Sequence, residues 1–131
     1  AERFSEALKI MPDHADAHGN LGVIFMRTGH PEEGTLEFAE KVRLKPKDAG
    51  ARLNYGLALL DQNQPAEAAT QFNEALRLQP GSALGHYRLS LALAKQGHSP
   101  EAIAQCREAL RLQPDFPDAR EALEQWTHST N

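Results

Sequence analysis

The chain has 131 residues, of which 40% are hydrophobic and 24% are charged, and its formal net charge is −4. This acidic balance argues against a nucleic-acid-binding protein, which needs a basic surface for its phosphate contacts. No apolar run reaches the roughly 18 residues that a membrane-spanning helix requires. The single cysteine, Cys106, excludes an internal disulfide bond.

Four prolines lie at identical spacings of 34 residues: Pro12, Pro46, Pro80 and Pro114. The heptapeptide from Glu74 to Pro80 also recurs letter for letter from Glu108 to Pro114. A fixed period of this length indicates that one supersecondary unit is stacked several times. The sequence therefore predicts a solenoid in which each unit packs on its neighbours and no central core is shared.

Two amphipathic helices separated by a turn are predicted within each period. Small and apolar residues recur three to four positions apart, as at Leu21 and Phe25 in the first helix and at Gly34, Phe38 and Val42 in the second, which is the spacing of one helix face. The full periods span residues 15–48, 49–82 and 83–116. No segment alternates with period two, so we predict no strands.

The turns carry residues that end one helix and begin the next. Gly29 suits the end of a first helix, and Pro31 suits the first turn of a second helix, where its missing N–H costs nothing. The corresponding breaks are Asn63-Gln64-Pro65 and Gly97-His98-Ser99-Pro100. Each second helix should stop before the proline that closes its period, because proline disfavours a helical residue ahead of it.

The two ends of the chain differ from the full periods. Residues 1–14 match only the second helix of a preceding unit, so we expect the C-terminal part of a longer array with an open, apolar N-terminal end at Phe4 and Leu8. Residues 117–131 predict a capping helix that ends near Thr127, followed by a frayed tail. Its apolar positions, which should cover the third repeat, are Ala119, Leu123 and Trp126.

This pattern resembles the tetratricopeptide repeat (TPR) over nearly the whole chain. The large-small-large positions of the first helices read Leu21-Gly22-Phe25, Tyr55-Gly56-Leu59 and Leu89-Ser90-Leu93. The resemblance implies an all-α fold, a right-handed superhelical solenoid of antiparallel helix pairs with a C-terminal capping helix. Lys41 departs from the pattern by replacing a small residue, and polar side chains stand at the usual bulky fourth position: His18, Arg52 and His86. Looser packing is expected at these seams.

Motifs for catalysis, cofactors and metals are missing from the sequence. It contains no Gly-rich phosphate loop, no His-Glu-x-x-His and no paired cysteines. The histidines follow the repeat, since His18 and His86 share one position and His30 and His98 share another. Cys106 replaces the aromatic residue of the other repeats, which predicts a buried, unreactive thiol. We therefore predict a chain without enzymatic activity, cofactor or metal site.

The resemblance implies that the first helices line a concave groove. Asn20 and Asn54 share one groove position, where an amide could pair with a peptide backbone; the alternative is a solvated or helix-bonded side chain. Apolar side chains at another groove position form a column along the array, and Met26, Leu53 and Leu60 extend it. Such a column indicates either a partner site or partial burial between first helices. Its members are Val23, Leu57 and Leu91.

Positive charge enters the groove at Arg27, Arg88 and Lys95, beside Tyr87. Arg88 falls where the TPR carboxylate clamp has a matching residue type, and Asn54 does so too. Other clamp positions differ and carry Val23, Gly19 and Leu84. We therefore expect a weak preference for acidic residues, bound by Arg88 and Lys95, and no true clamp.

The functional hypothesis is a non-catalytic protein-interaction module that binds a peptide or partner segment in the groove. Two alternatives stay open. The chain could be the substrate-docking tail of a larger enzyme, for example a membrane-bound transferase. It could also be a scaffold that self-associates through its open N-terminal end. Nucleic-acid binding and direct membrane insertion of this segment are not expected.

Overall fold

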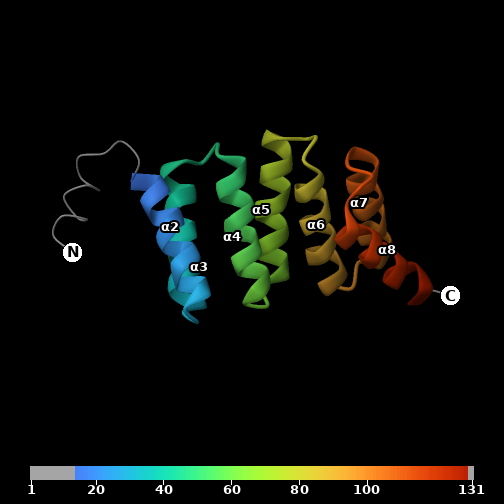
Figure 1. Cartoon of the computed structure of the whole chain (residues 1–131), viewed down its shortest axis with the longest axis horizontal. Coiled ribbons are helices and arrows are strands. Elements are labelled where there is room, and N and C mark those ends of the chain that lie inside the picture. Colours follow the sequence, from blue (N-terminus) through green and yellow to red (C-terminus); the bar gives the residue numbers. More distant parts are fainter. Residues whose placement is uncertain (1–13, 130–131) are drawn as a thin grey trace.

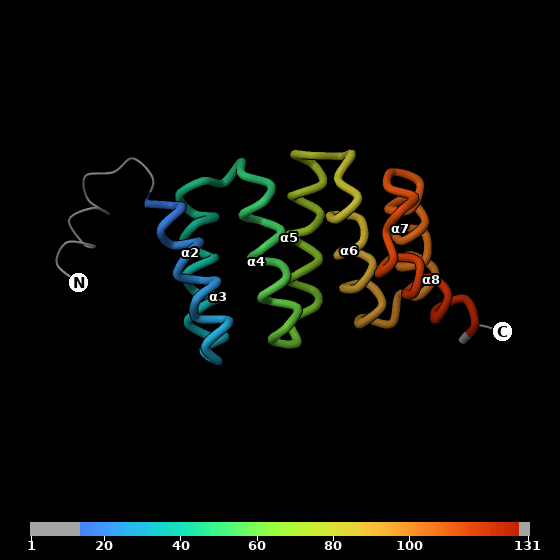
Figure 2. Tube along the Cα trace, in the orientation of Figure 1, coloured from blue at the N-terminus to red at the C-terminus, as the bar shows by residue number. Residues whose placement is uncertain are grey.

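The computed structural model describes residues 14–129, and these residues form seven α-helices and no strand (Figure 1). Three antiparallel pairs stand side by side in a row, and a single helix closes the row (Figure 2). This arrangement confirms the all-α solenoid. The helices are α2 (His14–Arg27), α3 (Pro31–Leu44), α4 (Ala49–Asp61), α5 (Pro65–Leu78), α6 (Ala83–Lys95), α7 (Ser99–Leu112) and α8 (Pro117–Ser129).

The turn inside each pair contains one residue with a left-handed backbone. Gly29 and Gly97 both have φ of 82°, and Asn63 takes the same place with φ of 62°. Asparagine tolerates this region better than most residues with a side chain, which explains how the second pair turns without glycine. Between pairs, two side chains cap the next helix at its N-terminus. Asp48 accepts a hydrogen bond from the backbone N–H of Ala51 at 3.1 Å and caps α4. Ser82 accepts one from the backbone N–H of Gly85 at 3.0 Å and caps α6.

Complementary side-chain sizes hold each pair together. The ring of Phe72 lies so close to Gly56 that a β-carbon there would be 2.5 Å from it, and Gly22 faces Phe38 in the same way. In the third pair Ser90 stands at the glycine position, and the smaller Cys106 replaces the ring. Both of these side chains are fully buried. The size change at one position is therefore matched by the opposite change at the other.

The polar residues at the fourth repeat position form hydrogen bonds between the two helices of a pair. This corrects the expectation of loose packing there, because each side chain reaches a polar partner on the second helix. Arg52 Nε also donates to the Pro46 carbonyl at 3.1 Å, and His86 Nε2 lies 3.0 Å from the Pro80 carbonyl. The pairs between helices are His18–Glu37 at 2.6 Å, Arg52–Gln71 at 3.0 Å and His86–Gln105 at 2.7 Å.

Lys41 also packs more tightly than expected. Gly19 on α2 leaves room for its aliphatic stem, since a β-carbon at Gly19 would meet that stem at 2.9 Å. The ammonium lies 3.6 Å from the Asp16 carboxylate. The missing side chain at Gly19 thus compensates for the long side chain at Lys41.

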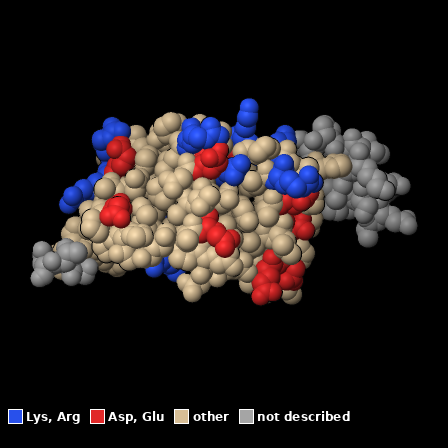
Figure 3. Space-filling model, turned by 180° about the vertical axis from the view of Figure 1, so that it is seen from behind, with Lys and Arg blue, Asp and Glu red and all other residues tan. Residues whose placement is uncertain are grey.

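Charged side chains follow the helix dipoles of the second helices. Acidic residues stand in the first turns of α3, α5 and α7, and basic residues stand in their last turns, where each sign is favoured. Figure 3 shows Lys and Arg mainly along the upper edge of one face, with Asp and Glu extending further down. Equivalent exposed pairs join Arg43 to Glu40, Arg77 to Glu74 and Arg111 to Glu108.

Some predictions concern residues at the ends of the chain. The expected second-helix remnant at residues 1–14, with Phe4 and Leu8, lies outside the described residues apart from His14. At the other end α8 extends to Ser129, beyond its expected end near Thr127. The hydroxyl of Thr127 donates to the Leu123 carbonyl at 2.8 Å within this last turn. Within residues 14–129, no helix is both long and apolar enough to span a lipid bilayer.

Candidate functional site: the concave groove

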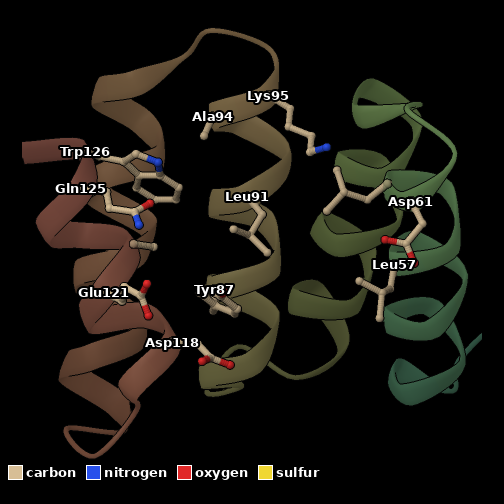
Figure 4. A pocket seen from close by; sticks show the side chains of 12 residues that line it. Leu57, Asp61, Tyr87, Leu91, Ala94, Lys95, Asp118, Glu121, Gln125 and Trp126 are labelled. Atoms are coloured by element: carbon tan, nitrogen blue, oxygen red, sulfur yellow. The ribbon is translucent and has the colours of Figure 1, made fainter. Parts of the chain in front are cut away.

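Two neighbouring cavities lie along the first helices. The larger, of about 590 Å³, lies between α4, α6 and α8 (Figure 4). The smaller, of about 210 Å³, lies between α2 and α4. Leu57 and Asp61 of α4 line both cavities, so the two form adjacent parts of one groove. A volume of several hundred Å³ is typical of ligand pockets.

Most of the residues predicted for the groove line these cavities. Val23, Arg27 and Asn54 line the smaller cavity together with Leu57. The larger cavity contains Leu57 and the α6 residues Tyr87, Leu91 and Lys95. Asn20 is exposed on α2, and Arg88 is half-buried on α6, but neither lines a cavity described here.

The apolar column is partly exposed, as a binding surface requires. Val23 is 39% exposed, and Leu57 and Leu91 are half-buried. The proposed extensions Leu53 and Leu60 are only 7% and 4% exposed. They belong to the buried cluster shared by α4, α5 and α6, because the next helix pair packs over them. The expectation that Leu53 extends the exposed column is therefore corrected, whereas Leu60, although buried, still lines the larger cavity.

Arg88 is held by the protein itself. One terminal nitrogen of its guanidinium donates to the Leu53 carbonyl at 3.2 Å, which links α6 to α4. Burial lowers the pKa of Arg88, and the negative charge of Asp61 acts in the opposite direction. The side chain is thus engaged between two repeats, whereas Lys95 is exposed at the cavity rim.

Helix α8 supplies a cavity wall that the sequence analysis did not identify. Figure 4 shows Asp118, Glu121, Gln125 and Trp126 on the side of α8 that faces α6. The repeat register contained the signal: counting from Pro117 as the start of a fourth unit places the first three of these at groove positions. From the sequence this segment was considered only as a cap, and the groove positions were not extended into it.

Trp126 contributes both to the packing of α8 and to the larger cavity. Its side chain is half-buried and packs on the cluster formed by Cys106, Ala109, Ala119 and Ala122. It also lines the larger cavity. The expected capping contact is therefore present, and the same residue contributes to the wall of the cavity.

Tyr87 of α6 lines the larger cavity. Its ring packs against Phe116, with ring centroids 5.0 Å apart. Burial raises the pKa of the Tyr87 phenol, and the nearby Asp118 carboxylate raises it further. The phenol is therefore neutral at physiological pH and can serve as a hydrogen-bond donor.

Cys106 lies behind this wall and plays a structural part. Its side chain is fully buried, and Sγ donates to the Ala119 carbonyl at 3.0 Å. Burial raises the pKa of the thiol, which disfavours the reactive thiolate. The prediction of a buried, unreactive cysteine agrees with this environment.

The chain was compared with known proteins. A sequence profile described as tetratricopeptide repeat matches residues 33–83 and 56–117, well over half of the chain. No curated protein sequence matches significantly. MamA is a similar solved structure, with a TM-score of 0.85, 21% identity and coverage of 97% of this chain and 74% of that chain.

Two further similar structures contain peptides. The first TPR of Spaghetti (RPAP3), bound to the HSP90 peptide SRMEEVD, has a TM-score of 0.84 and 18% identity, covering 88% of this chain and 92% of that chain. The second TPR domain of human RPAP3, in complex with the HSP70 peptide SGPTIEEVD, has a TM-score of 0.81 and 20% identity, covering 86% and 94%. The repeat register, the stacked helix pairs and the profile match agree, and the chain belongs to the tetratricopeptide repeat family.

Proposed function

We propose that this chain is a non-catalytic protein-interaction module that binds an extended partner segment in its concave groove. The observation that carries the proposal is the pair of adjoining cavities, which share Leu57 and Asp61 and expose apolar side chains. A contiguous, partly apolar groove is typical of a partner site. The proposed repeats 15–48, 49–82 and 83–116 each contribute one first helix to it.

Asparagines along the groove would bind the backbone of the partner segment. Asn54 is exposed and lines the smaller cavity, and Asn20 is exposed at the same repeat position on α2. An amide side chain offers both a donor and an acceptor, so it can pair with a peptide unit whatever the peptide sequence. Leu57 and Leu91 would contact apolar side chains of the same segment.

The structural neighbours are consistent with this function. Those from RPAP3 are bound to an HSP90 peptide and an HSP70 peptide. Their low identity to this chain means that the shared feature is the scaffold, while the bound sequence depends on the residues of each groove.

A peptide array screened with the labelled chain tests the proposal. Leu57→Glu should weaken the strongest peptides roughly tenfold or more, because it places a charge on an apolar contact surface. Asn54→Ala should weaken them roughly two- to tenfold, as expected for one or two lost hydrogen bonds.

Matched controls lie on the second helices. Leu36→Glu changes an apolar residue that is 70% exposed on α3, and Asn73→Ala changes an exposed asparagine on α5. Both should leave peptide binding unchanged. If peptides bind the groove variants as tightly as the parent chain while the melting temperature is constant, the groove is not the site.

A further inference from the structure

The larger cavity indicates the chemistry of the partner. On the basis of the proposed function, we infer that this cavity receives a segment with an apolar side chain next to lysine or arginine. The partner is thus a basic, apolar stretch of a protein. Three features support this inference: an apolar floor, a surplus of carboxylates on the walls, and aromatic side chains beside those carboxylates.

The floor of the cavity is apolar and comes from three helices. Leu57 projects from α4 and Leu91 from α6 (Figure 4). Ala122 of α8 also lines the cavity. These residues are buried or half-buried, so a space enclosed between them favours an apolar side chain that leaves water. The floor alone does not distinguish one apolar partner from another.

The charge of the cavity walls indicates which apolar partner fits. Asp118 and Glu121 of α8 and Asp61 of α4 line the cavity, and Lys95 is the one cation among the described lining residues. Figure 4 shows Lys95 extending from α6 toward α4, on the side opposite Asp118 and Glu121. None of the ion pairs between described residues involves these three carboxylates. A cationic side chain is therefore complementary to the α8 wall.

A long basic side chain fits this wall better than a compact cation. The aliphatic stem of lysine or arginine packs on apolar surface while its charged end stays near water. Trp126 and Tyr87 flank the two α8 carboxylates in the cavity lining (Figure 4). A cation above an aromatic face gains further attraction from the ring. Both aromatic residues thus favour the same type of side chain as the carboxylates.

The same geometry argues against the acidic partner expected from the sequence. That expectation relied on Arg88 and Lys95. Arg88 is engaged with the Leu53 carbonyl and lines no cavity described here. Lys95 is outnumbered by carboxylates at the rim. An acidic segment in the larger cavity would face like charges on the α8 wall.

The test begins with a phage-displayed library of random dodecapeptides selected against the parent chain. We expect lysine or arginine next to leucine, isoleucine, phenylalanine or valine to be enriched above the library background. The most enriched peptide is then synthesised with a fluorescent label, and its binding is measured by anisotropy. Replacing the basic residue of this peptide with glutamate should lower its affinity more than replacing the same residue with glutamine.

Variants of the chain locate the interaction. Glu121→Gln should weaken binding of that peptide roughly two- to fivefold, the range of an exposed ion pair. Glu124→Gln is the matched control, since Glu124 is exposed on the same helix outside the cavity and its change alters the net charge equally. The difference between the two variants should shrink at about 0.5 M salt, where charges are screened over a few ångströms.

Each outcome decides one claim. Selection without enrichment of basic residues, or equal effects of Glu121→Gln and Glu124→Gln, overturns the inferred partner chemistry. Enriched acidic peptides that still depend on Leu57 would leave the groove function standing and reject only the basic partner. Two results would reject the groove function itself. One is that no peptide is enriched. The other is that Leu36→Glu weakens peptide binding while Leu57→Glu leaves it unchanged.

Discussion

At the scale of single residues, paired compensations explain how the repeat tolerates its departures. Gly56 leaves room for the ring of Phe72. In the third pair the larger Ser90 replaces the glycine, and the smaller Cys106 replaces the phenylalanine. Gly19 likewise makes room for Lys41. In a close-packed interior an added group requires a missing group nearby. A substitution at only one member of such a pair should therefore lower the stability of the fold.

Gly56→Ala should destabilise the chain by about 1 kcal/mol. Overpacking against Phe72 costs about 1–3 kcal/mol, and the better helix propensity of alanine returns about 1 kcal/mol. Gly81→Ala is the control, because a β-carbon at Gly81 meets no atom within 4 Å. Urea unfolding of both variants measures the difference. If Gly56→Ala is instead more stable than Gly81→Ala by about the 1 kcal/mol of helix propensity, Phe72 moves aside without cost.

At the scale of elements, α8 has one face in the packed core and another in the larger cavity. Ala119 and Leu123 pack against the third pair, and Cys106 donates to the Ala119 carbonyl. Asp118, Glu121 and Gln125 follow at helical spacing on the neighbouring side and line the cavity. A helix rotated by about 100° per residue can present both faces. The capping helix therefore also completes the groove.

Ala119→Asp should release α8 and expose Cys106. A carboxylate at this fully buried site has no partner and is costly to bury. Because roughly 1.4 kcal/mol changes an equilibrium tenfold, we expect Cys106 to react at least roughly tenfold faster with iodoacetamide. In the parent chain the raised pKa of the thiol keeps the reaction slow at pH 8. Glu124→Ala, on the exposed side of α8, should leave the rate unchanged.

At the scale of the whole molecule, buried apolar residues are unevenly distributed along the described helices. The cluster of buried residues that includes Leu53, Leu59, Phe72 and Leu89 joins α4, α5 and α6. In a stacked array each unit is stabilised by its neighbours. Helices with neighbours on both sides therefore open less often than α8, which packs mainly on the third pair.

Hydrogen exchange followed by mass spectrometry should reveal this gradient. Backbone amides of α4 and α5 should exchange more slowly than those of α8, because local opening costs less where fewer apolar contacts are lost. Binding of the selected basic peptide should slow exchange in α8, since that helix forms one wall of its site. Uniform exchange along all helices would instead indicate a single cooperative unit.

Local signals made much of the fold predictable. The proline register and the glycine or asparagine turns specified where helices begin and end, because these residues act through their own backbone geometry. Cys106 was correctly placed in the core by its repeat position. Lys41 and the polar fourth positions were misjudged, because their partners, such as Gly19 and Glu37, are distant in sequence and become neighbours only after folding.

The sequence by itself determined the repeat and the helix pairs, since a 34-residue period and helical spacing depend on local order along the chain. Only the tertiary structure decided the charge of the site. It placed Asp118 and Glu121 of α8 opposite Leu57 and Asp61 of α4 in one cavity, and it engaged Arg88 elsewhere. The electrostatic field of a cavity depends on which charges meet in space, and that depends on how the units stack.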